Sequence, residues 1–306
     1  MLRQGQEKQV QITIVGLGFI GGSIGLALQE SGEEIQITGH DREPSQAQRA
    51  RKIGAIDRAE RNLIHASEGA DIVVLALPPD GLRDTLEAMA ANLKPGCLTT
   101  DTATVKGAVM NWAEEMLPPQ VAFVGGDPIV QSPERGLDGA SADLFQDQLY
   151  CLTPGADVPT DAVQRMVELV RLLGAEPYFI DAQEHDGVRA AVEHLPALLI
   201  ALLLREMALS AAPQELRRLR GQLLVQASEL MRGKAATYPA LCLDNSSAIS
   251  HWSQAMRREL RELEQLIDTG DREGLEVLFE EVLSFEEMGH QEELPHPSLL
   301  RRMLWR

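Results

Sequence analysis

The sequence predicts an α/β fold, built on a doubly wound and mostly parallel sheet, followed by an all-helical domain. Two observations predict the sheet. Short β-branched runs alternate with helical patterns over the first 180 residues, and several runs are almost continuously apolar, as strands covered on both faces should be. A third observation predicts the helical domain, because stretches rich in Leu, Ala, Glu and Arg take over after Asp181. We therefore expect domains at residues 1–181 and 182–306.

Seven runs are predicted strands, and helical patterns lie between and after them. The third long helix of the second domain carries apolar residues at helical spacing, with charges between them. Broad apolar faces of this kind often continue across a dimer interface, so we expect a homodimer. The predicted strands cover residues 9–15, 35–39, 72–77, 97–101, 121–124, 150–152 and 178–180, and the predicted helices cover residues 20–29, 162–173, 185–209, 215–232, 247–268 and 271–288.

A glycine-rich motif, Gly16-Leu17-Gly18-Phe19-Ile20-Gly21, follows the first predicted strand and opens the first helix. In this context it is typical of a Rossmann dinucleotide-binding domain. Gly16 allows the tight turn, Gly18 lets the backbone approach a pyrophosphate, and Gly21 lets the helix pack closely on the strand. The N–H groups at the start of the helix would hold the diphosphate. A glycine-rich turn that binds nothing is the competing interpretation.

An acidic residue stands where such a domain contacts the ribose. Asp41 lies 20 residues after Gly21, at the end of the next strand. A carboxylate there accepts from the ribose hydroxyls and repels a 2′-phosphate, which favours NAD. Arg42 can stack on adenine or pair with a phosphate, which keeps NADP as the alternative. The predicted cofactor-binding residues are Gly16, Gly18, Phe19, Ile20, Gly21, Asp41, Arg42, Leu77, Pro78 and Asp101.

Composition excludes several classes of partner and site. The net charge is −18, from 28 basic and 46 acidic residues, and a chain this acidic repels nucleic acid. The longest apolar stretch, residues 195–204, is too short to span a membrane and is followed by Arg205. Three widely spaced cysteines fit neither a zinc site nor a disulfide framework, which favours the cytoplasm. No metal-ligand spacing is present.

Six segments together resemble the prephenate and arogenate dehydrogenases of tyrosine biosynthesis. The resemblance implies a Rossmann domain and a helical dimerisation domain. It also implies oxidation of a cyclohexadienol, with loss of its ring carboxylate and transfer of a hydride to the nicotinamide. The substrate would be small and anionic or zwitterionic. The segments are GLGFIGGSIGLAL (16–28), ADIVVLALP (70–78), DTATVKG (101–107), FVGGDPIV (123–130), DLFQDQLYCLTP (143–154) and EHDGVRAAVEHLPALLIALL (184–203).

The resemblance also implies site residues. Thr104 keeps the hydroxyl of the family's DxxSVKG motif, and His194 keeps the first histidine of its SHLPH motif, whose second histidine is Ala197 here. We assign Thr104 and His194 to catalysis, and Ser132 and Arg232 to substrate binding. A histidine in an apolar helix is often only a core residue, but the pair His185-Asp186, nine residues before His194, strengthens its functional interpretation.

Asp127 is the main departure, because the family has a histidine at this position that polarises the ring hydroxyl. Asp127 is assigned to catalysis as a carboxylate that accepts a proton. Alternatively it has lost this chemistry, or it faces away and caps the turn before Pro128. An isolated carboxylate about 5 Å from a substrate carboxylate would cost about 3 kcal/mol at an effective dielectric of about 20. Asp127→His is then expected to raise the oxidation of prephenate or arogenate.

The predicted function is therefore that of a prephenate/arogenate dehydrogenase-like oxidoreductase that uses NAD. Two alternatives stay open. One is a related dehydrogenase that acts on an amino-substituted prephenate analogue in a secondary pathway, since a ring ammonium would be attracted to Asp127. The other is a non-catalytic dinucleotide-binding sensor, which the changes at Asp127 and Ala197 favour.

Overall fold

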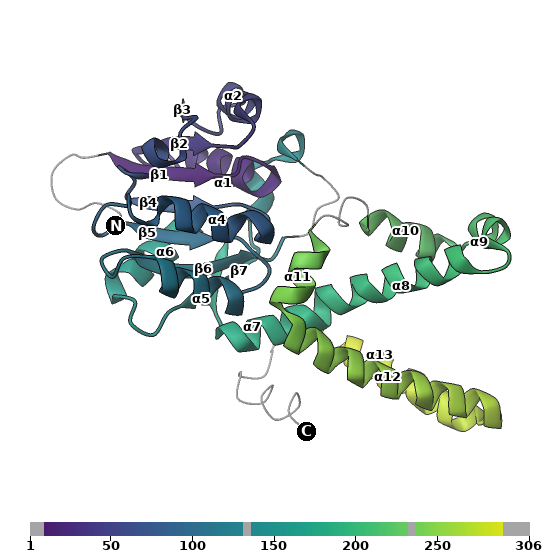
Figure 1. Cartoon of the computed structure of the whole chain (residues 1–306). Coiled ribbons are helices and arrows are strands. Elements are labelled where there is room, and N and C mark those ends of the chain that lie inside the picture. The colour runs from purple at the N-terminus through teal and green to yellow at the C-terminus, as the bar shows by residue number, and fades with distance from the viewer. Residues whose placement is uncertain (1–8, 131–135, 232–236, 290–306) are drawn as a thin grey trace. The chain divides into compact units, whose positions relative to one another are not determined.

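The computed structural model describes residues 9–130, 136–231 and 237–289. The chain forms two compact units, Met1–Ile249 and Ser250–Arg306, and each is described by itself (Figure 1). The first unit contains the sheet and several helices that follow it, and the second contains two long helices. The predicted class, a mostly parallel α/β sheet followed by helices, is confirmed. The division at residues 1–181 and 182–306 stays a prediction.

The sheet has eight strands in the order β3-β2-β1-β4-β5-β6-β7-β8. All neighbouring strands are parallel except β6 and β7, which are antiparallel. The order reverses between β1 and β4, and ligands of doubly wound sheets bind at this point, outside the carboxyl ends of the strands. The strands are β1 (Val10–Val15), β2 (Ile35–His40), β3 (Arg58–Ala59), β4 (Ile72–Leu75), β5 (Leu98–Asp101), β6 (Ala122–Pro128), β7 (Leu149–Pro154) and β8 (Glu176–Phe179).

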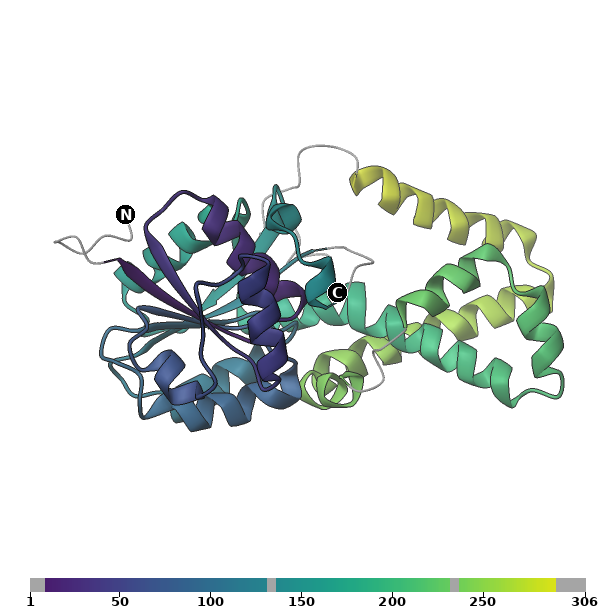
Figure 2. The same ribbon diagram turned by 90° about the horizontal axis from the view of Figure 1, so that it is seen from above.

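Helices cover both faces of the sheet (Figure 2). One buried apolar cluster joins α1 (Phe19–Glu30) and α6 (Thr160–Leu172) to one face, and a second joins α4 (Pro79–Ala90) and α5 (Gly107–Met116) to the other. The central strand β4 is apolar throughout because its side chains enter both clusters. The remaining helices in the sheet-containing part of the chain are α2 (Pro44–Lys52), α3 (Leu63–Ser67), η1 (Leu137–Gly139) and η2 (Ala142–Phe145).

Four features of the structure differ from the sequence prediction. The helix expected over residues 215–232 is two helices, α9 (Pro213–Leu219) and α10 (Gln222–Leu230), because Arg220 and Gly221 adopt extended backbone. The short helix α11 (Tyr238–Asp244) was not predicted, and neither was the two-residue strand β3. The helix expected over residues 185–209 consists of α7 (Ala182–Arg189), a π-helix at Ala190–His194, and α8 (Leu195–Leu209).

The π-helix lies next to Pro196, near the start of α8. Proline has no N–H to donate to the carbonyl four residues earlier, and its ring crowds that carbonyl. One widened turn accommodates the proline without breaking the helix, and such turns are frequent at functional sites. The sequence Glu193-His194-Leu195-Pro196 therefore places His194 at the end of the widened turn.

The continuous helical segment Ala182–Leu209 is 28 residues long, and by length and composition alone it could cross a membrane. The apolar stretch at residues 195–204, which is too short by itself to span a membrane, is only part of this segment. Large apolar side chains along the segment are exposed, including Val192, Leu202, Leu203 and Leu209. Its first part nevertheless carries His185, Asp186 and Arg189, whose partners belong to the sheet and α5.

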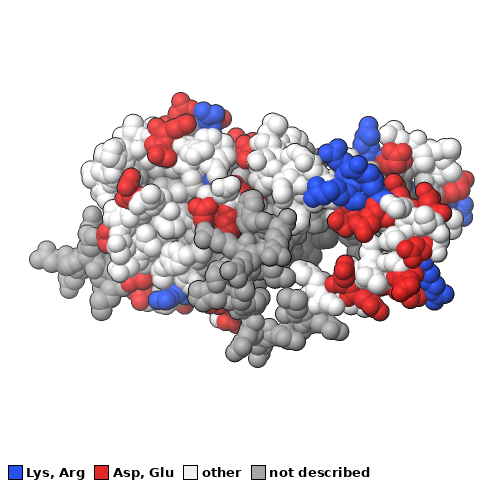
Figure 3. Space-filling model, turned by 90° about the horizontal axis from the view of Figure 1, so that it is seen from below, with Lys and Arg blue, Asp and Glu red and all other residues white. Residues whose placement is uncertain are grey.

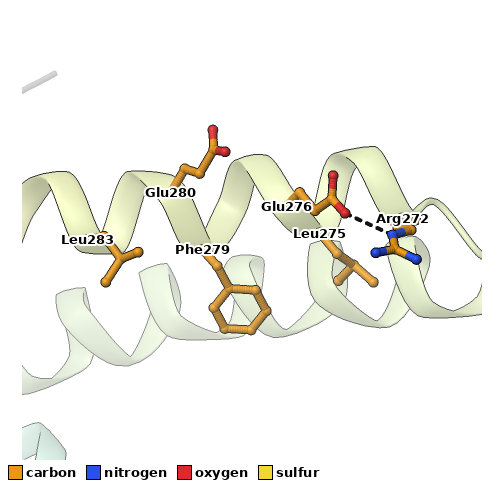
Figure 4. A pocket seen from close by; sticks show the side chains of 6 residues that line it. All are labelled: Arg272, Leu275, Glu276, Phe279, Glu280 and Leu283. Atoms are coloured by element: carbon orange, nitrogen blue, oxygen red, sulfur yellow. Dashed lines mark hydrogen bonds and ion pairs between the residues drawn. The ribbon is translucent and has the colours of Figure 1, made fainter.

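The second unit comprises most of α12 (Ser246–Thr269) and all of α13 (Arg272–Gly289). An open groove of about 340 Å³ follows α13 (Figure 4). Leu275, Phe279 and Leu283 give it an apolar floor, and Arg272 forms an ion pair with Glu276 at one end. The groove shares no residue with the predicted functional site.

On the face shown in Figure 3, Lys and Arg side chains lie among Asp and Glu side chains.

Candidate active site

The glycine-rich loop connects β1 to α1 at the switch point of the sheet. Gly16 has φ +91°, and a Cβ there would lie 2.3 Å from the carbonyl oxygen of Ala76. A Cβ on Gly21 would lie 1.9 Å from the carbonyl oxygen of Gly16. The fold therefore requires both glycines. A Cβ on Gly18 would meet nothing within 4 Å. Gly18 borders open space at the start of α1, which suits a site that a diphosphate approaches closely.

Asp41, at the end of β2, is bonded to this loop. Its Oδ2 accepts from the N–H of Leu17 at 2.9 Å, and its Oδ1 accepts from the N–H of Glu43 at 2.9 Å. Each carboxylate oxygen can accept a further hydrogen bond, so these contacts orient Asp41 and leave it able to bind a ribose. Arg42 is exposed beside it. Of the other predicted cofactor residues, Phe19, Ile20 and Leu77 are half-buried and Pro78 is exposed.

Asp101 has different partners from those expected. Its side chain is fully buried, and it forms an ion pair with the equally buried Lys106. Its oxygens also accept from the N–H groups of Ala103, at 2.8 Å, and Gly126, at 3.1 Å. Burial raises the pKa of Asp101, and the Lys106 charge opposes that shift. The Asp101 side chain therefore holds the loop between β5 and α5 in place, and its contact with the cofactor stays a prediction.

Asp186 ties α7 to the start of α5. Its Oδ1 accepts from the N–H of Lys106 at 2.6 Å, and its Oδ2 accepts from the N–H of Gly107 at 2.8 Å. The first turn of α5 has no side-chain cap of its own, so Asp186 satisfies N–H groups that the helix leaves unpaired. Two segments that the sequence analysis treated separately, DTATVKG and EHDGVRA, are thus joined by hydrogen bonds.

His185 connects Asp186 to Asp127, which lies in β6. Its Nδ1 is 3.0 Å from Oδ1 of Asp186, and its Nε2 is 3.0 Å from Oδ2 of Asp127. Nε of Arg189 also lies 3.0 Å from Oδ2 of Asp127. Asp127 and His185 are both buried. Asp127 therefore faces a histidine and an arginine on α7, and the interpretation that it turns away to cap Pro128 is wrong.

The surroundings of His185 favour its protonated form. Burial lowers its pKa, but the hydrogen bonds to Asp127 and Asp186 and the charge of Asp127 outweigh burial and raise the pKa above 6.5. The protonated ring can donate from Nδ1 to Asp186 and from Nε2 to Asp127. Asp127 thus lies between two cationic groups, and the isolated charge assumed from the sequence does not exist here.

His194 and Asn245 complete the cluster from the other side. His194 is fully buried at the end of the π-helix, and its Nδ1 is 3.2 Å from Nδ2 of Asn245. Asn245, after α11, also donates from Nδ2 to the carbonyl oxygen of Asp186 at 2.9 Å. Burial lowers the pKa of His194 to about 4, and the charge of Arg189 adds to this shift. His194 is therefore neutral at pH 7.

The remaining predicted residues have varied positions. Thr104 is half-buried in the loop between Asp101 and Lys106. Ser132 and Arg232, predicted to bind substrate, lie outside the described residues. Within residues 9–130, 136–231 and 237–289, no group of three or more His, Cys, Asp or Glu residues could hold a metal ion.

Sequence reasoning missed five members of the cluster as functional residues. His185 and Asp186 were noted only for their place before His194, and Lys106 only as part of the DTATVKG segment. Their pairing across the fold had no local signal. Arg189 lies one helical turn after His185, so helical spacing from a suspected histidine could have found it. Nothing in the sequence around Asn245 marked it. The five residues are Lys106, His185, Asp186, Arg189 and Asn245.

Comparison with known families gives two matches that adjoin. Residues 24–179 match the prephenate dehydrogenase nucleotide-binding domain, and residues 181–281 match the prephenate dehydrogenase dimerization domain. The first match begins after the glycine-rich loop, so the assignment of that loop depends on its geometry and its neighbours.

Individual relatives agree with these matches. The chain is 33% identical over 198 residues to a prephenate dehydrogenase of Bacillus subtilis, over 64% of this chain and 53% of that protein. It is 29% identical over 274 residues to a prephenate dehydrogenase of Lactococcus lactis, over 89% and 75% of the two chains. It is also 29% identical over 241 residues to a 4-amino-4-deoxyprephenate dehydrogenase of Streptomyces pristinaespiralis, over 75% of each chain. The matched region thus spans about half of the Bacillus relative.

A solved structure supports the same fold. Arogenate dehydrogenase of Synechocystis superposes with a TM-score of 0.78 at 26% sequence identity, over 91% of this chain and 99% of that chain.

Proposed function

The chain belongs to the prephenate dehydrogenase family, and from this premise we propose that it oxidises a cyclohexadienyl substrate of the prephenate or arogenate type with NAD. In this reaction a hydride leaves the ring carbon that bears the hydroxyl, and the hydroxyl passes its proton to the protein. The ring carboxylate then leaves as CO₂, its bonding electrons make the ring aromatic, and the proton returns to the oxygen of the phenol product. The observation that carries the proposal is the buried cluster of Asp127, His185 and Arg189, beside a histidine whose Nε2 has no hydrogen-bond partner among the described residues.

The glycine-rich loop and Asp41 fit a dinucleotide. The open space at Gly18 and the N–H groups at the start of α1 would hold the diphosphate, and Asp41 would accept from the ribose hydroxyls. NAD, when bound, accepts the hydride. Leu77 and Pro78 follow β4 at the same edge of the sheet and would line the nicotinamide side of the crevice.

The cluster around Asp127 can take the proton from the substrate hydroxyl. A carboxylate can accept that proton, and a neutral His185 ring, 3.0 Å from Asp127, can receive it in turn. Asp186 holds the far side of the ring, so His185 keeps its orientation. Thr104 would contribute its hydroxyl near the reacting carbon, as the family resemblance implies. Asp127 and His185 together would thus replace the single histidine that the family has at position 127.

The neighbours of Asp127 balance its charge, so the cluster does not exclude an anionic substrate. The penalty of about 3 kcal/mol for an isolated carboxylate does not apply, because Arg189 and a protonated His185 both contact Asp127. An amino-substituted analogue is nevertheless a second candidate, because Asp127 remains a carboxylate and one relative carries that activity in its name. A sensor that lacks chemistry has less support, since Asp127, His185 and His194 are arranged together.

A panel of substrates tests the proposed function. NADH formation at 340 nm should be observed with prephenate or arogenate, at rates well above those with 4-amino-4-deoxyprephenate. Preference for the amino compound would establish the second candidate. Binding of NAD without turnover of any of the three compounds would leave the sensor as the interpretation.

The choice between NAD and NADP should depend on Asp41. We expect wild-type protein to bind NAD more tightly, because Asp41 repels a 2′-phosphate. Asp41→Ser should narrow the NAD/NADP affinity ratio by roughly tenfold or more, which corresponds to the loss of about 1.4 kcal/mol of discrimination. Fluorescence titration with both cofactors measures the ratio, and Asp161→Ser, exposed in the first turn of α6, serves as control. Wild-type affinities that are equal, or that favour NADP, would show that Arg42 sets the choice.

The rate should rise with pH as His185 loses its proton. A neutral His185 can receive a proton through Asp127, whereas the protonated ring cannot. The kcat profile should therefore have an ascending limb with a midpoint above 6.5, because the pKa of His185 is raised. The midpoint is a property of the coupled cluster as a whole. His185→Gln should lower the rate and abolish the limb. An unchanged limb in this variant would exclude His185 as the titrating group.

Assembly and location complete the proposal. The dimerization domain that matches residues 181–281, together with exposed apolar side chains on α8 and α13, supports a homodimer formed through residues 182–288. The dimer interface would cover the apolar helical segment at residues 182–209, which by length and composition could otherwise cross a membrane. Light scattering should give twice the chain mass of 33.6 kDa, and a monomer at micromolar concentration would contradict this. Three unpaired cysteines support a cytoplasmic location.

A further inference from the structure

Asn245 contacts two groups of the active site through one nitrogen. Its Nδ2 donates to the carbonyl oxygen of Asp186 at 2.9 Å and lies 3.2 Å from Nδ1 of His194. Both Asn245 and His194 are buried. A carbonyl oxygen only accepts hydrogen bonds, so the part of the amide that faces Asp186 must be the NH₂ group. The Asp186 carbonyl therefore determines the orientation of the Asn245 amide.

This orientation decides which nitrogen of His194 carries the proton. One hydrogen of the Asn245 NH₂ group is directed to Asp186, and the other is directed to Nδ1 of His194. Nδ1 must then be the acceptor, and the proton of the neutral ring lies on Nε2. The neutral form of the His194 ring at pH 7 is supported independently, because burial lowers the pKa of His194 to about 4.

The Nε2–H group of His194 has no partner among the residues that the structure describes. Buried donors in proteins are almost always paired, and an unmade bond of this kind is costly. No carboxylate among the described residues bonds to it: Asp186 accepts from His185 and from the start of α5, and Asp127 contacts His185 and Arg189. A ligand oxygen would supply the missing acceptor.

We propose that Asn245 is a positioning residue that holds His194 as the Nε2–H tautomer, so that this group donates a hydrogen bond to an oxygen of the bound substrate. His194 then orients the substrate, and the proton of the ring hydroxyl goes to Asp127 and His185 instead. The identity of the ligand rests on the proposed function, whereas the tautomer of the free protein does not.

Histidine NMR of the free protein tests the tautomer directly. In a long-range ¹H–¹⁵N correlation spectrum, a protonated ring nitrogen and an unprotonated one resonate in well-separated regions. The chain has seven histidines, and the signal of His194 is identified by its loss in His194→Gln. We expect a protonated Nε2 and an unprotonated Nδ1 at pH 7. A protonated Nδ1, or protonation of both nitrogens, would overturn the proposal.

Ligand binding tests the donor. The probe is 3-(4-hydroxyphenyl)propionate, an unreactive phenolic acid that resembles the product, added together with NAD. Binding should shift the Nε2–H resonance of His194, and binding without such a shift would refute the donor role. If neither the probe nor prephenate nor arogenate binds, the proposed function is rejected, and so is the hydrogen bond from His194 to the substrate. If the substrates bind but His194 has the other tautomer, only the role of Asn245 and His194 inferred here is rejected.

A variant of Asn245 separates positioning from folding. In Asn245→Asp a carboxylate faces Nδ1. Measured at a pH above the pKa of His194, which this carboxylate raises, the proton of the neutral ring should lie on Nδ1 and Nε2 should have no proton to donate. Affinity for the probe should fall about tenfold to a hundredfold, the effect of one buried hydrogen bond. Asn111→Asp, on the exposed side of α5, is the matched control and should leave both readouts unchanged. If folded Asn245→Asp keeps the wild-type tautomer or the wild-type affinity for the probe, the proposal is overturned. If this variant does not fold, the tautomer seen in the wild-type spectra, with and without the probe, tests the proposal.

Discussion

Asp127→Asn is expected to lower kcat/KM for prephenate or arogenate by about 10² to 10⁴, the range typical of a lost proton acceptor. The amide keeps the size of the side chain but removes the charge that pairs with His185 and Arg189 and the capacity to accept the substrate's proton. Steady-state kinetics at saturating NAD measure the loss. Asp84→Asn, exposed on α4, is the matched control.

The contacts of Asp127 with His185 and Arg189 also change the result expected for Asp127→His, for which the sequence alone predicted a gain in activity. An imidazole at position 127 would face His185 and Arg189 with no carboxylate between them, so a loss of activity of at least about a hundredfold is expected, equal to one lost proton acceptor. A gain would show that the contacts of Asp127 with α7 do not persist when substrate binds. NAD affinity should be unchanged in either variant.

Lys106→Met should destabilise the protein by about 3 to 5 kcal/mol, because it leaves the carboxylate of Asp101 buried without its partner. Urea denaturation measures the free energy of unfolding. The double variant Asp101→Asn with Lys106→Met should recover part of the loss, since no charge then remains buried.

The exposed pair Arg49–Asp138 is the control for this experiment. Asp138→Asn should change the free energy of unfolding by less than about 1 kcal/mol, as is usual for surface ion pairs. If Lys106→Met has an equally small effect, the buried pair does not hold the loop between β5 and α5.

Local patterns predicted the sheet and the glycine-rich loop because the properties that define them are local. The apolar run at β4 and the spacing from Gly16 to Asp41 lie within short stretches of chain. The break between α9 and α10 also had a local signal in Gly221, which the prediction of one helix over residues 215–232 did not take into account. The strand β3 has two residues and was too short to be recognised by periodicity.

The site could be predicted only as separate residues. Asp127, Thr104 and His194 were identified from the family resemblance, but their protonation and charge depend on partners distant in sequence. His185 is 58 residues from Asp127, and Asn245 is 51 residues from His194. Asp101 was predicted to bind the cofactor. Its burial against Lys106 is a tertiary property that no local pattern expresses.

The stoichiometry of the reaction tests the central claim most directly. Purified protein is incubated with NAD and either prephenate or arogenate, and NADH is measured by absorbance while released CO₂ is trapped and counted. Oxidative decarboxylation predicts one CO₂ for each NADH, with the rates of formation of both lowered by the same factor in Asp127→Asn. Absence of NADH with both substrates, or NADH without CO₂, would contradict the proposed reaction.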